Sequence, residues 1–272
     1  MNIINAIILG IVQGLTEFLP VSSSGHLVLV QKIFGITAPA MFFDTMVHVG
    51  TLLAVFVVLW QDIYAILKKI VQPLTGFLII ATIPAVAAAL LFGDAIEHAF
   101  ESGQFLGVSF LLTSVLLVVC ELISRRAGNG SPLKKSGDMN WLDALIIGIL
   151  QAVAIIPGIS RSGATISGAL SRKLDRDFAA RFSFLLSIPA ILGAVVLQTK
   201  TLVTGEAAGT AGESIGAAAV IAGTASAAIV GFFAVKLMLK MIREKSLFGF
   251  AVYTAALGIL VLIDQFAAHL VF

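Results

Sequence analysis

Hydrophobic residues run continuously through most of the chain, and six runs are long enough to cross a membrane. These runs lie near residues 42–61, 74–92, 104–123, 179–199, 214–238 and 247–268. An α-helix needs about 20 apolar residues to span the hydrocarbon core of a bilayer. A transmembrane β-barrel would instead alternate apolar and polar positions. The pattern therefore predicts an all-α integral membrane protein with six transmembrane helices.

Two further apolar stretches, residues 1–34 and 141–171, are each interrupted by a short polar segment. The first is broken at Phe18–Ser24 and the second at Ile156–Ser162, and each break contains a proline. Each break leaves two arms that are too short to span a bilayer. Irregular backbone is tolerated at membrane depth only where protein or water satisfies its polar groups. We therefore expect two re-entrant helix-loop-helix hairpins, with their polar tips buried in the protein.

The two hairpin regions match one another when the sequence is shifted by 138 residues. The matched pairs are Gln13 with Gln151, Ser22 with Ser160, Ser23 with Arg161, Ser24 with Ser162, and Gly25 with Gly163. Each hairpin is followed by three predicted spans, and an odd number of spans inverts the second copy. We therefore expect one membrane domain, residues 1–272, formed by an inverted repeat of about 1–125 and about 139–272.

Charge placement predicts the orientation of this domain. Basic residues gather in alternate connections: Lys68, Lys69, Arg125, Arg126, Lys134, Lys135, Arg172, Lys173, Arg176, Lys240, Arg243 and Lys245. The connection at 93–103 carries acidic residues and no Lys or Arg. The positive-inside rule places the basic connections in the cytoplasm and both termini outside. The hairpins then enter from opposite faces, and their tips meet near the midplane, where inverted-repeat proteins place their sites.

Composition agrees with this class and excludes others. The chain is 59% hydrophobic and 12% charged, whereas soluble domains are about a quarter charged. Its mean hydropathy is +1.06. The net charge is only +2, and no basic arm or nucleic-acid-binding motif is present. We expect the bilayer, and no nucleic acid, as the partner of this protein.

The polar tips carry the candidate chemistry. A helix restarts near Ser22–Ser24 and another near Ser160–Ser162, and serine is a strong N-cap. Two helix N-termini facing one pocket form an anion site. Arg161 adds a planar guanidinium that suits phosphate oxygens. The pattern predicts a site for a phosphate group within an apolar protein, which suits a lipid with a phosphate head.

Glu17 follows Gln13 by four positions, so both share one helix face. A carboxylate beside a phosphate is repulsive unless a partner offsets it. A divalent cation, Mg²⁺ or Ca²⁺, held by Glu17 and the Gln13 oxygen would do so. Alternatively, Glu17 acts as a base, and His26, three residues after Ser23, transfers protons near neutral pH. Serine, histidine and carboxylate around an anion site suit displacement at phosphorus.

Simpler interpretations apply to several of these residues. A serine at a helix break can serve only as a cap. A histidine within a span, such as His48, is as readily a packing residue as a functional one, and we expect His98 in a solvated loop. A carboxylate such as Glu17 is costly to bury in a membrane and is functional by default.

Two signature segments resemble a known family. "QGLTEFLPVSSSGH" and "PGISRSGATISG" are similar to the signature regions of the bacterial undecaprenyl-diphosphate phosphatases of the BacA/UppP type, as are "FFDTMVHVGTLLAV" and "RFSFLLSIPAILGA". The resemblance covers essentially the whole chain. It implies a plasma-membrane hydrolase that converts undecaprenyl diphosphate to undecaprenyl phosphate and inorganic phosphate. This reaction recycles the lipid carrier for cell-wall synthesis, and the family is associated with bacitracin resistance.

The resemblance also implies a divalent cation, a tendency to form homodimers, and a site open to the outer face. Carried over by position, the implied catalytic residues are Glu17, Ser23, His26 and Arg161. The implied substrate-binding residues are Gln13, Ser22, Ser24, Ser160, Ser162 and Thr165, with Glu17 and Gln13 as metal ligands. Gln13 is the neutral variant of an acidic pair. Ser23 is the preferred nucleophile, and a water activated by Glu17 or His26 is the alternative.

Two other classes of function compete with hydrolysis. Inverted repeats and broken helices are also the architecture of transporters, so a flippase for a polyprenyl phosphate lipid is the main rival. Phosphate release from a polyprenyl diphosphate would favour the enzyme, whereas lipid movement without release would favour the transporter. A membrane scaffold would function without Glu17 and Arg161.

Overall fold

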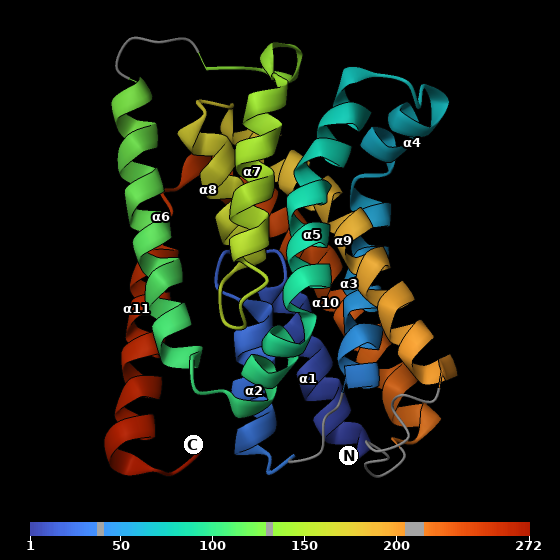
Figure 1. Ribbon diagram of the computed structural model, residues 1–272, viewed down its shortest axis with the longest axis vertical. Helices are drawn as coiled ribbons and strands as arrows, with labels where there is room; N and C mark the ends of the chain where they lie inside the picture. Colours follow the sequence, from blue (N-terminus) through green and yellow to red (C-terminus); the bar gives the residue numbers. More distant parts are fainter. Residues whose placement is uncertain (37–40, 129–132, 205–214) are drawn as a thin grey trace.

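A computed structural model of the chain describes residues 1–36, 41–128, 133–204 and 215–272. Within these residues the protein is helical throughout, and the one β-type contact is an isolated bridge between Lys134 and Leu174 (Figure 1). The predicted all-α fold is confirmed.

The first half of the chain forms a short hairpin followed by longer helices. Its elements are α1 (Ile3–Thr16), α2 (Ser23–Ile33), α3 (Met41–Val58), α4 (Trp60–Lys68), α5 (Pro73–Ser102) and α6 (Leu106–Gly128). The second half has the same order of hairpin and long helices. Its elements are the 3₁₀ turn η1 (Ser136–Asp138), α7 (Trp141–Val153), α8 (Arg161–Ser171), α9 (Arg176–Thr204), α10 (Ala217–Glu244), α11 (Phe248–Ile263) and the π-helical turn η3 (Asp264–Ala268).

The predicted spans are found, with one of them bent. Among the described residues, α5, α6, α9, α10 and α11 contain segments long and apolar enough to cross a membrane. The sixth span is α3, which bends by 78° into α4 at Leu59. These five spans and the bent pair account for the six that the hydrophobic pattern predicts.

Two boundaries differ from the expectation. Residues 93–103 do not form a connection, because α5 continues to Ser102 with only a local departure from helical geometry at Phe92 (φ −123°, ψ 16°). His98 therefore lies on a helix, not in a loop. In the same way, α10 extends to Glu244 and includes Lys240 and Arg243. An apolar window marks only the part of a helix within hydrocarbon, whereas backbone hydrogen bonding carries the helix further.

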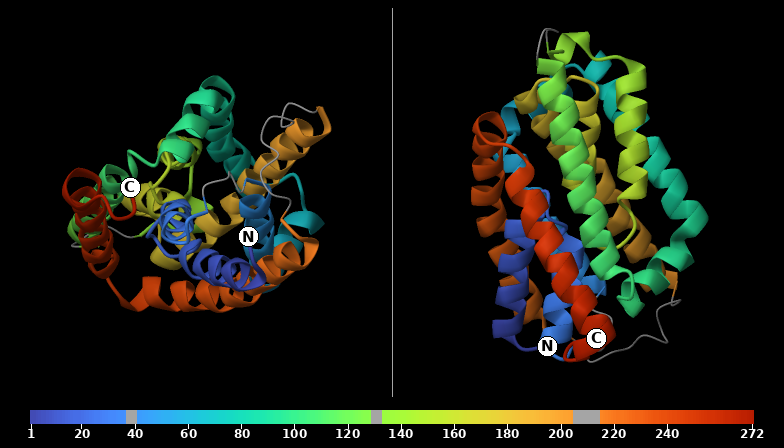
Figure 2. Two further views of the ribbon diagram at one scale, coloured as in Figure 1. Left: turned by 90° about the horizontal axis from the view of Figure 1, so that it is seen from below. Right: turned by 90° about the vertical axis from the view of Figure 1, so that its left-hand side faces the viewer.

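The two hairpins enter the molecule from opposite ends. In Figure 1 the α1–α2 hairpin enters from the end where both termini lie, the α7–α8 hairpin enters from the other end, and their connecting loops lie at mid-height. The packing is reciprocal: α1 packs against α10 of the second half, and α7 packs against α5 of the first (Figure 2). Two inverted copies of one unit would pack in this way.

Small residues bring α10 unusually close to α1 and α3. A Cβ atom added at Gly10 would lie 2.2 Å from the carbonyl oxygen of Gly223, and one added at Gly50 would lie 2.4 Å from that of Thr224. Only glycine permits this backbone-to-backbone approach, which is common between membrane helices. The contact fixes α1 and α3 relative to each other, and both carry residues of the site described below.

Ion pairs concentrate at the end of the molecule opposite the termini. Arg172 and Lys134 both bind the fully buried carboxylate of Asp143. Arg176 binds the buried Glu121. The basic residues at the C-terminal ends of α4, α6, α8 and α10 thus share one end (Figure 1). This is the grouping that the charge pattern predicts.

Candidate active site between the hairpin tips

Each tip ends where a serine begins the returning helix. The Ser22 hydroxyl accepts a hydrogen bond from the Gly25 N–H at 3.2 Å, and the Ser160 hydroxyl accepts one from the Gly163 N–H at 3.0 Å. Both predicted N-caps are therefore present. Ser22 also has a positive φ of 73°, which turns the chain sharply before α2.

The two tips are joined directly. The Ser162 hydroxyl donates to the Leu19 carbonyl of the first tip at 3.0 Å, and the Gly158 N–H of the second tip donates to the Ser24 hydroxyl at 3.4 Å. Ser24 and Ser162 are equivalent in the internal match of the sequence, and each bonds to the opposite tip. These two predicted substrate-binding residues thus hold the tips together.

Glu17 lies at the centre of the site. Its Oε2 atom accepts hydrogen bonds from the Ser23 hydroxyl at 2.5 Å and from the Gln13 amide nitrogen at 2.9 Å. Its Oε1 atom accepts one from Arg161 Nη2 at 2.7 Å. The residue is only 5% exposed. The structure brings together four of the predicted site residues, three from the first hairpin and one from the second.

Arg161 retains an unused donor at this point. It is the first residue of α8, so its side chain lies beside the free N–H groups of that helix. Its Nη1 atom is buried and has no hydrogen-bond partner among the described residues. The Gln13 Oε1 atom is likewise buried and unpaired. Buried polar groups are nearly always hydrogen-bonded, so these two atoms indicate a site that a ligand completes.

His26 has partners other than those expected. Its Nδ1 atom is 2.6 Å from the Ser22 carbonyl oxygen, and its Nε2 atom is 2.7 Å from the Tyr253 hydroxyl of α11. Its ring also stacks on the Tyr253 ring, with 5.7 Å between centroids. Both ring nitrogens are therefore engaged away from Glu17. In this arrangement His26 supports the turn at Ser22.

Thr165 lies one helical turn beyond Arg161. Its hydroxyl bonds to the Arg161 carbonyl at 2.9 Å and to the Ser183 hydroxyl of α9 at 2.6 Å. It is almost completely buried. Its described contacts tie the start of α8 to α9.

One residue near the carboxylate is absent from the sequence-based set of site residues. His48 of α3 places Nε2 3.5 Å from Glu17 Oε2. The sequence offered only the family-like segment "FFDTMVHVGTLLAV" as a signal, because a single histidine in an apolar span does not reveal what it faces.

The described side chains do not form a resident metal site. No group of three His, Cys, Asp or Glu residues lies close enough to hold an ion within the described part of the chain. Both oxygens of Glu17 are bonded to Arg161, Ser23 and Gln13. Mg²⁺ and Ca²⁺ require six or more oxygen ligands. Among the described side chains bonded to Glu17, Gln13 has an oxygen, Oε1, without a hydrogen-bond partner, so most ligands would have to come from a substrate or water.

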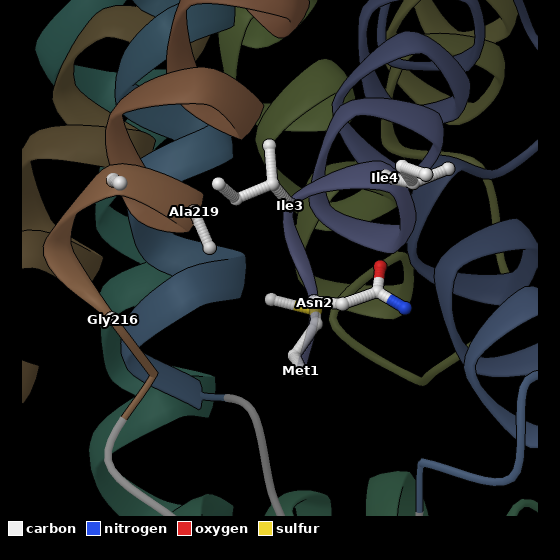
Figure 3. A pocket seen from close by; sticks show the side chains of 7 residues that line it. Met1, Asn2, Ile3, Ile4, Gly216 and Ala219 are labelled. Carbon is white, nitrogen blue, oxygen red and sulfur yellow. The ribbon is translucent and has the colours of Figure 1, made fainter.

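A separate hollow of about 530 Å³ lies at the end of the molecule where the N-terminus is found (Figure 3). It is lined by the first four residues together with Gly216, Ala218 and Ala219. None of the predicted site residues lines it. Its wall is mainly apolar, and it offers no charged side chain to a phosphate.

Comparison with known proteins identifies the family. The family described as "Bacitracin resistance protein BacA" matches residues 6–260. The chain belongs to this family. It is 48% identical over 266 residues to "Undecaprenyl-diphosphatase 4" of Bacillus thuringiensis subsp. konkukian, covering 98% of each chain. It is 46% identical to "Undecaprenyl-diphosphatase" of Carboxydothermus hydrogenoformans, covering 98% of this chain and 99% of the relative. It is 40% identical to "Undecaprenyl-diphosphatase" of Methanosphaera stadtmanae, covering 97% and 98%. The resemblance inferred from the signature segments is confirmed.

Proposed function

We propose that this BacA-family protein hydrolyses undecaprenyl diphosphate to undecaprenyl phosphate and inorganic phosphate. The observation that carries the proposal is the meeting of a serine, a carboxylate and an arginine from two hairpins: Glu17 Oε2 lies 2.5 Å from Ser23 Oγ, and Glu17 Oε1 lies 2.7 Å from Arg161 Nη2. These are the parts needed for nucleophilic displacement at the terminal phosphorus of a diphosphate. The product returns the lipid carrier to cell-wall synthesis, and bacitracin resistance follows from keeping the diphosphate scarce.

Arg161 changes partners when the diphosphate binds. Its free Nη1 atom donates to a phosphate oxygen, and the negative charge of the diphosphate competes with Glu17 for the rest of the guanidinium. Loss of this cationic partner makes the Glu17 carboxylate more basic. The N–H groups at the starts of α2 and α8 supply further positive potential.

Ser23 then attacks the terminal phosphorus atom. Its proton passes to Glu17 over the existing 2.5 Å hydrogen bond, and the bond from that phosphorus to the bridging oxygen breaks. Undecaprenyl phosphate leaves, and water hydrolyses the phosphoserine. Arg161 stabilises the charge that develops on the phosphoryl oxygens. Direct attack by a water that Glu17 activates is the alternative course.

A divalent cation enters this scheme as part of the substrate. Mg²⁺ or Ca²⁺ binds diphosphate oxygens readily, and the free Gln13 Oε1 atom offers it one protein ligand. The cation would offset the repulsion between the diphosphate and Glu17. Glu17 itself would bind the cation only after releasing Arg161.

We place the protein in the bacterial plasma membrane, with the hairpin α1–α2 and both termini at the outer face. The support is the grouping of basic helix ends at the opposite end of the molecule. The site would then receive the lipid diphosphate from the outer side. A homodimer is also proposed. Few residues of the spanning part of α5 are buried, and the apolar side chains of Ile79, Ile83 and Val86 are exposed. They offer a surface for a second copy, which cross-linking from α5 in membranes would detect.

The direct test is reconstitution of the purified protein in liposomes containing undecaprenyl diphosphate. Release of inorganic phosphate, with undecaprenyl phosphate as the lipid product, supports the hydrolase. Movement of the lipid between leaflets without phosphate release would replace the proposal with the flippase. An inactive protein that binds no diphosphate would leave the scaffold as the explanation.

A further inference from the structure

We propose that His48 is a positioning residue for the Glu17 carboxylate during turnover. The inference rests on the proposed phosphatase function and adds a residue from a third element, α3, to a site otherwise built from the hairpins. His48 Nε2 faces Glu17 Oε2 at 3.5 Å, the same oxygen that accepts the Ser23 hydroxyl proton.

The His48 ring has a defined orientation. Its Nδ1 atom lies 2.6 Å from the Asp44 carbonyl oxygen, so Nδ1 carries a proton and donates it there. The Nε2 atom is thereby directed at Glu17. Nε2 attracts the Glu17 carboxylate when the ring carries a second proton, on Nε2. One helical turn of α3 thus fixes the ring, and the glycine contact of Gly50 with α10 fixes the helix. A side chain that packed only against lipid would need neither constraint.

The same turn of α3 is also bonded to α2. The Gln31 amide donates to the Asp44 carboxylate at 2.7 Å. Ser23 begins α2 and Glu17 ends α1, so α3 contacts both arms of the first hairpin through adjacent turns. This double attachment sets the distance between the serine and the carboxylate.

The role of His48 becomes greatest once substrate is bound. In the structure Arg161 holds Oε1 of Glu17, and the diphosphate is proposed to draw Arg161 away. His48 is then the remaining basic side chain at the carboxylate among the described residues. It keeps Oε2 directed at Ser23 at the moment of proton transfer. An interaction used in the reaction, and not in substrate binding, affects kcat more than KM.

The test compares His48→Ala, His48→Asn and His48→Gln in the phosphate-release assay, with His98→Ala as a matched histidine control on an exposed part of α5. Only the glutamine amide reaches as far as the imidazole Nε2. We expect His48→Ala and His48→Asn to lower kcat by about tenfold with KM within about twofold, and His48→Gln to recover most of the loss. The control should match the wild type.

Three results would overturn the inference. They are an unchanged kcat in His48→Asn, an equal loss in the asparagine and glutamine variants, or a loss expressed mainly in KM. The asparagine and glutamine variants carry the test if His48→Ala fails to fold, which size-exclusion chromatography in detergent detects. A wild type that releases no phosphate would instead refute the proposed function, so the two failures are distinguishable.

Discussion

Arg161 and Glu17 lie 144 residues apart in the chain and form a 2.7 Å ion pair where the two hairpin tips meet. Both side chains are largely buried, with exposed fractions of 19% and 4%. A buried pair of this kind is costly unless its geometry is good and its other hydrogen bonds are satisfied. Here one guanidinium nitrogen has no partner, so the pair is poised to accept a third group.

Substitution of Arg161 tests the proposed phosphate contact. Arg161→Ala should lower phosphate release by about a hundredfold or more, because the developing charge loses a preorganised donor. Arg161→Lys keeps the charge but lacks the planar guanidinium, so its rate of phosphate release should lie between those of the wild type and Arg161→Ala. Turnover of both variants is measured at saturating substrate in detergent. Near-normal turnover of a folded Arg161→Ala protein would remove the arginine from the mechanism.

Ser23 and Ser24 are adjacent, and their contacts assign them different roles. Ser23→Ala should lower turnover to about a thousandth of the wild-type rate or less, because the proposed nucleophile is lost. Ser24→Ala removes two 3.4 Å contacts, with the Gly158 N–H and with the Ser22 hydroxyl, and should stay within about tenfold of the wild type. Equal losses in the two variants would argue against Ser23 as the nucleophile and favour an activated water.

The glycine contact between α3 and α10 should matter for stability. A methyl group at Gly50 meets the Thr224 carbonyl oxygen at 2.4 Å, so Gly50→Ala should cost about 1–3 kcal/mol. Gly193→Ala is the matched control on α9, because nothing lies within 4 Å of its added Cβ. Thermal unfolding in detergent compares the two. A Gly50→Ala protein as stable as the control would contradict the close approach of the two helices.

The cation is proposed to arrive with the diphosphate. A chelator should therefore abolish phosphate release, and added Mg²⁺ or Ca²⁺ should restore it without refolding of the protein. Gln13→Leu should raise the cation concentration needed for half-maximal activity, because the unpaired Oε1 atom of Gln13 is removed. Turnover that is indifferent to chelation would eliminate the cation from the scheme.

The sequence predicted those parts of the site that depend on local spacing. Gln13 and Glu17 share a helix face because they are four positions apart, and Ser22 and Ser160 cap helices because each follows a break. The opposed hairpins predicted that Arg161 would meet the tip of the first hairpin, where it is bonded to Glu17. All of these expectations follow from helical periodicity, capping and topology, which can be inferred from the positions of residues in the sequence.

Contacts between distant helices could not be read in this way. Tyr253 meets His26 across 227 positions, and His48 faces Glu17 through the packing of α3. Both contacts depend on how a helix is rotated about its own axis. The sequence carries little information on that rotation when the helix is apolar on all sides. The extension of α5 to Ser102 was missed for a related reason, because the hydrophobic window ends before the helix does.

The most direct test of the site is phosphate release by Glu17→Gln alongside the wild type, with undecaprenyl diphosphate as the substrate. The amide keeps the size of the side chain but can neither accept the Ser23 proton nor pair with Arg161 as a charge. We predict that the wild type releases phosphate and that the folded Glu17→Gln protein does so at least about a hundredfold more slowly. Turnover by Glu17→Gln close to that of the wild type would contradict the account.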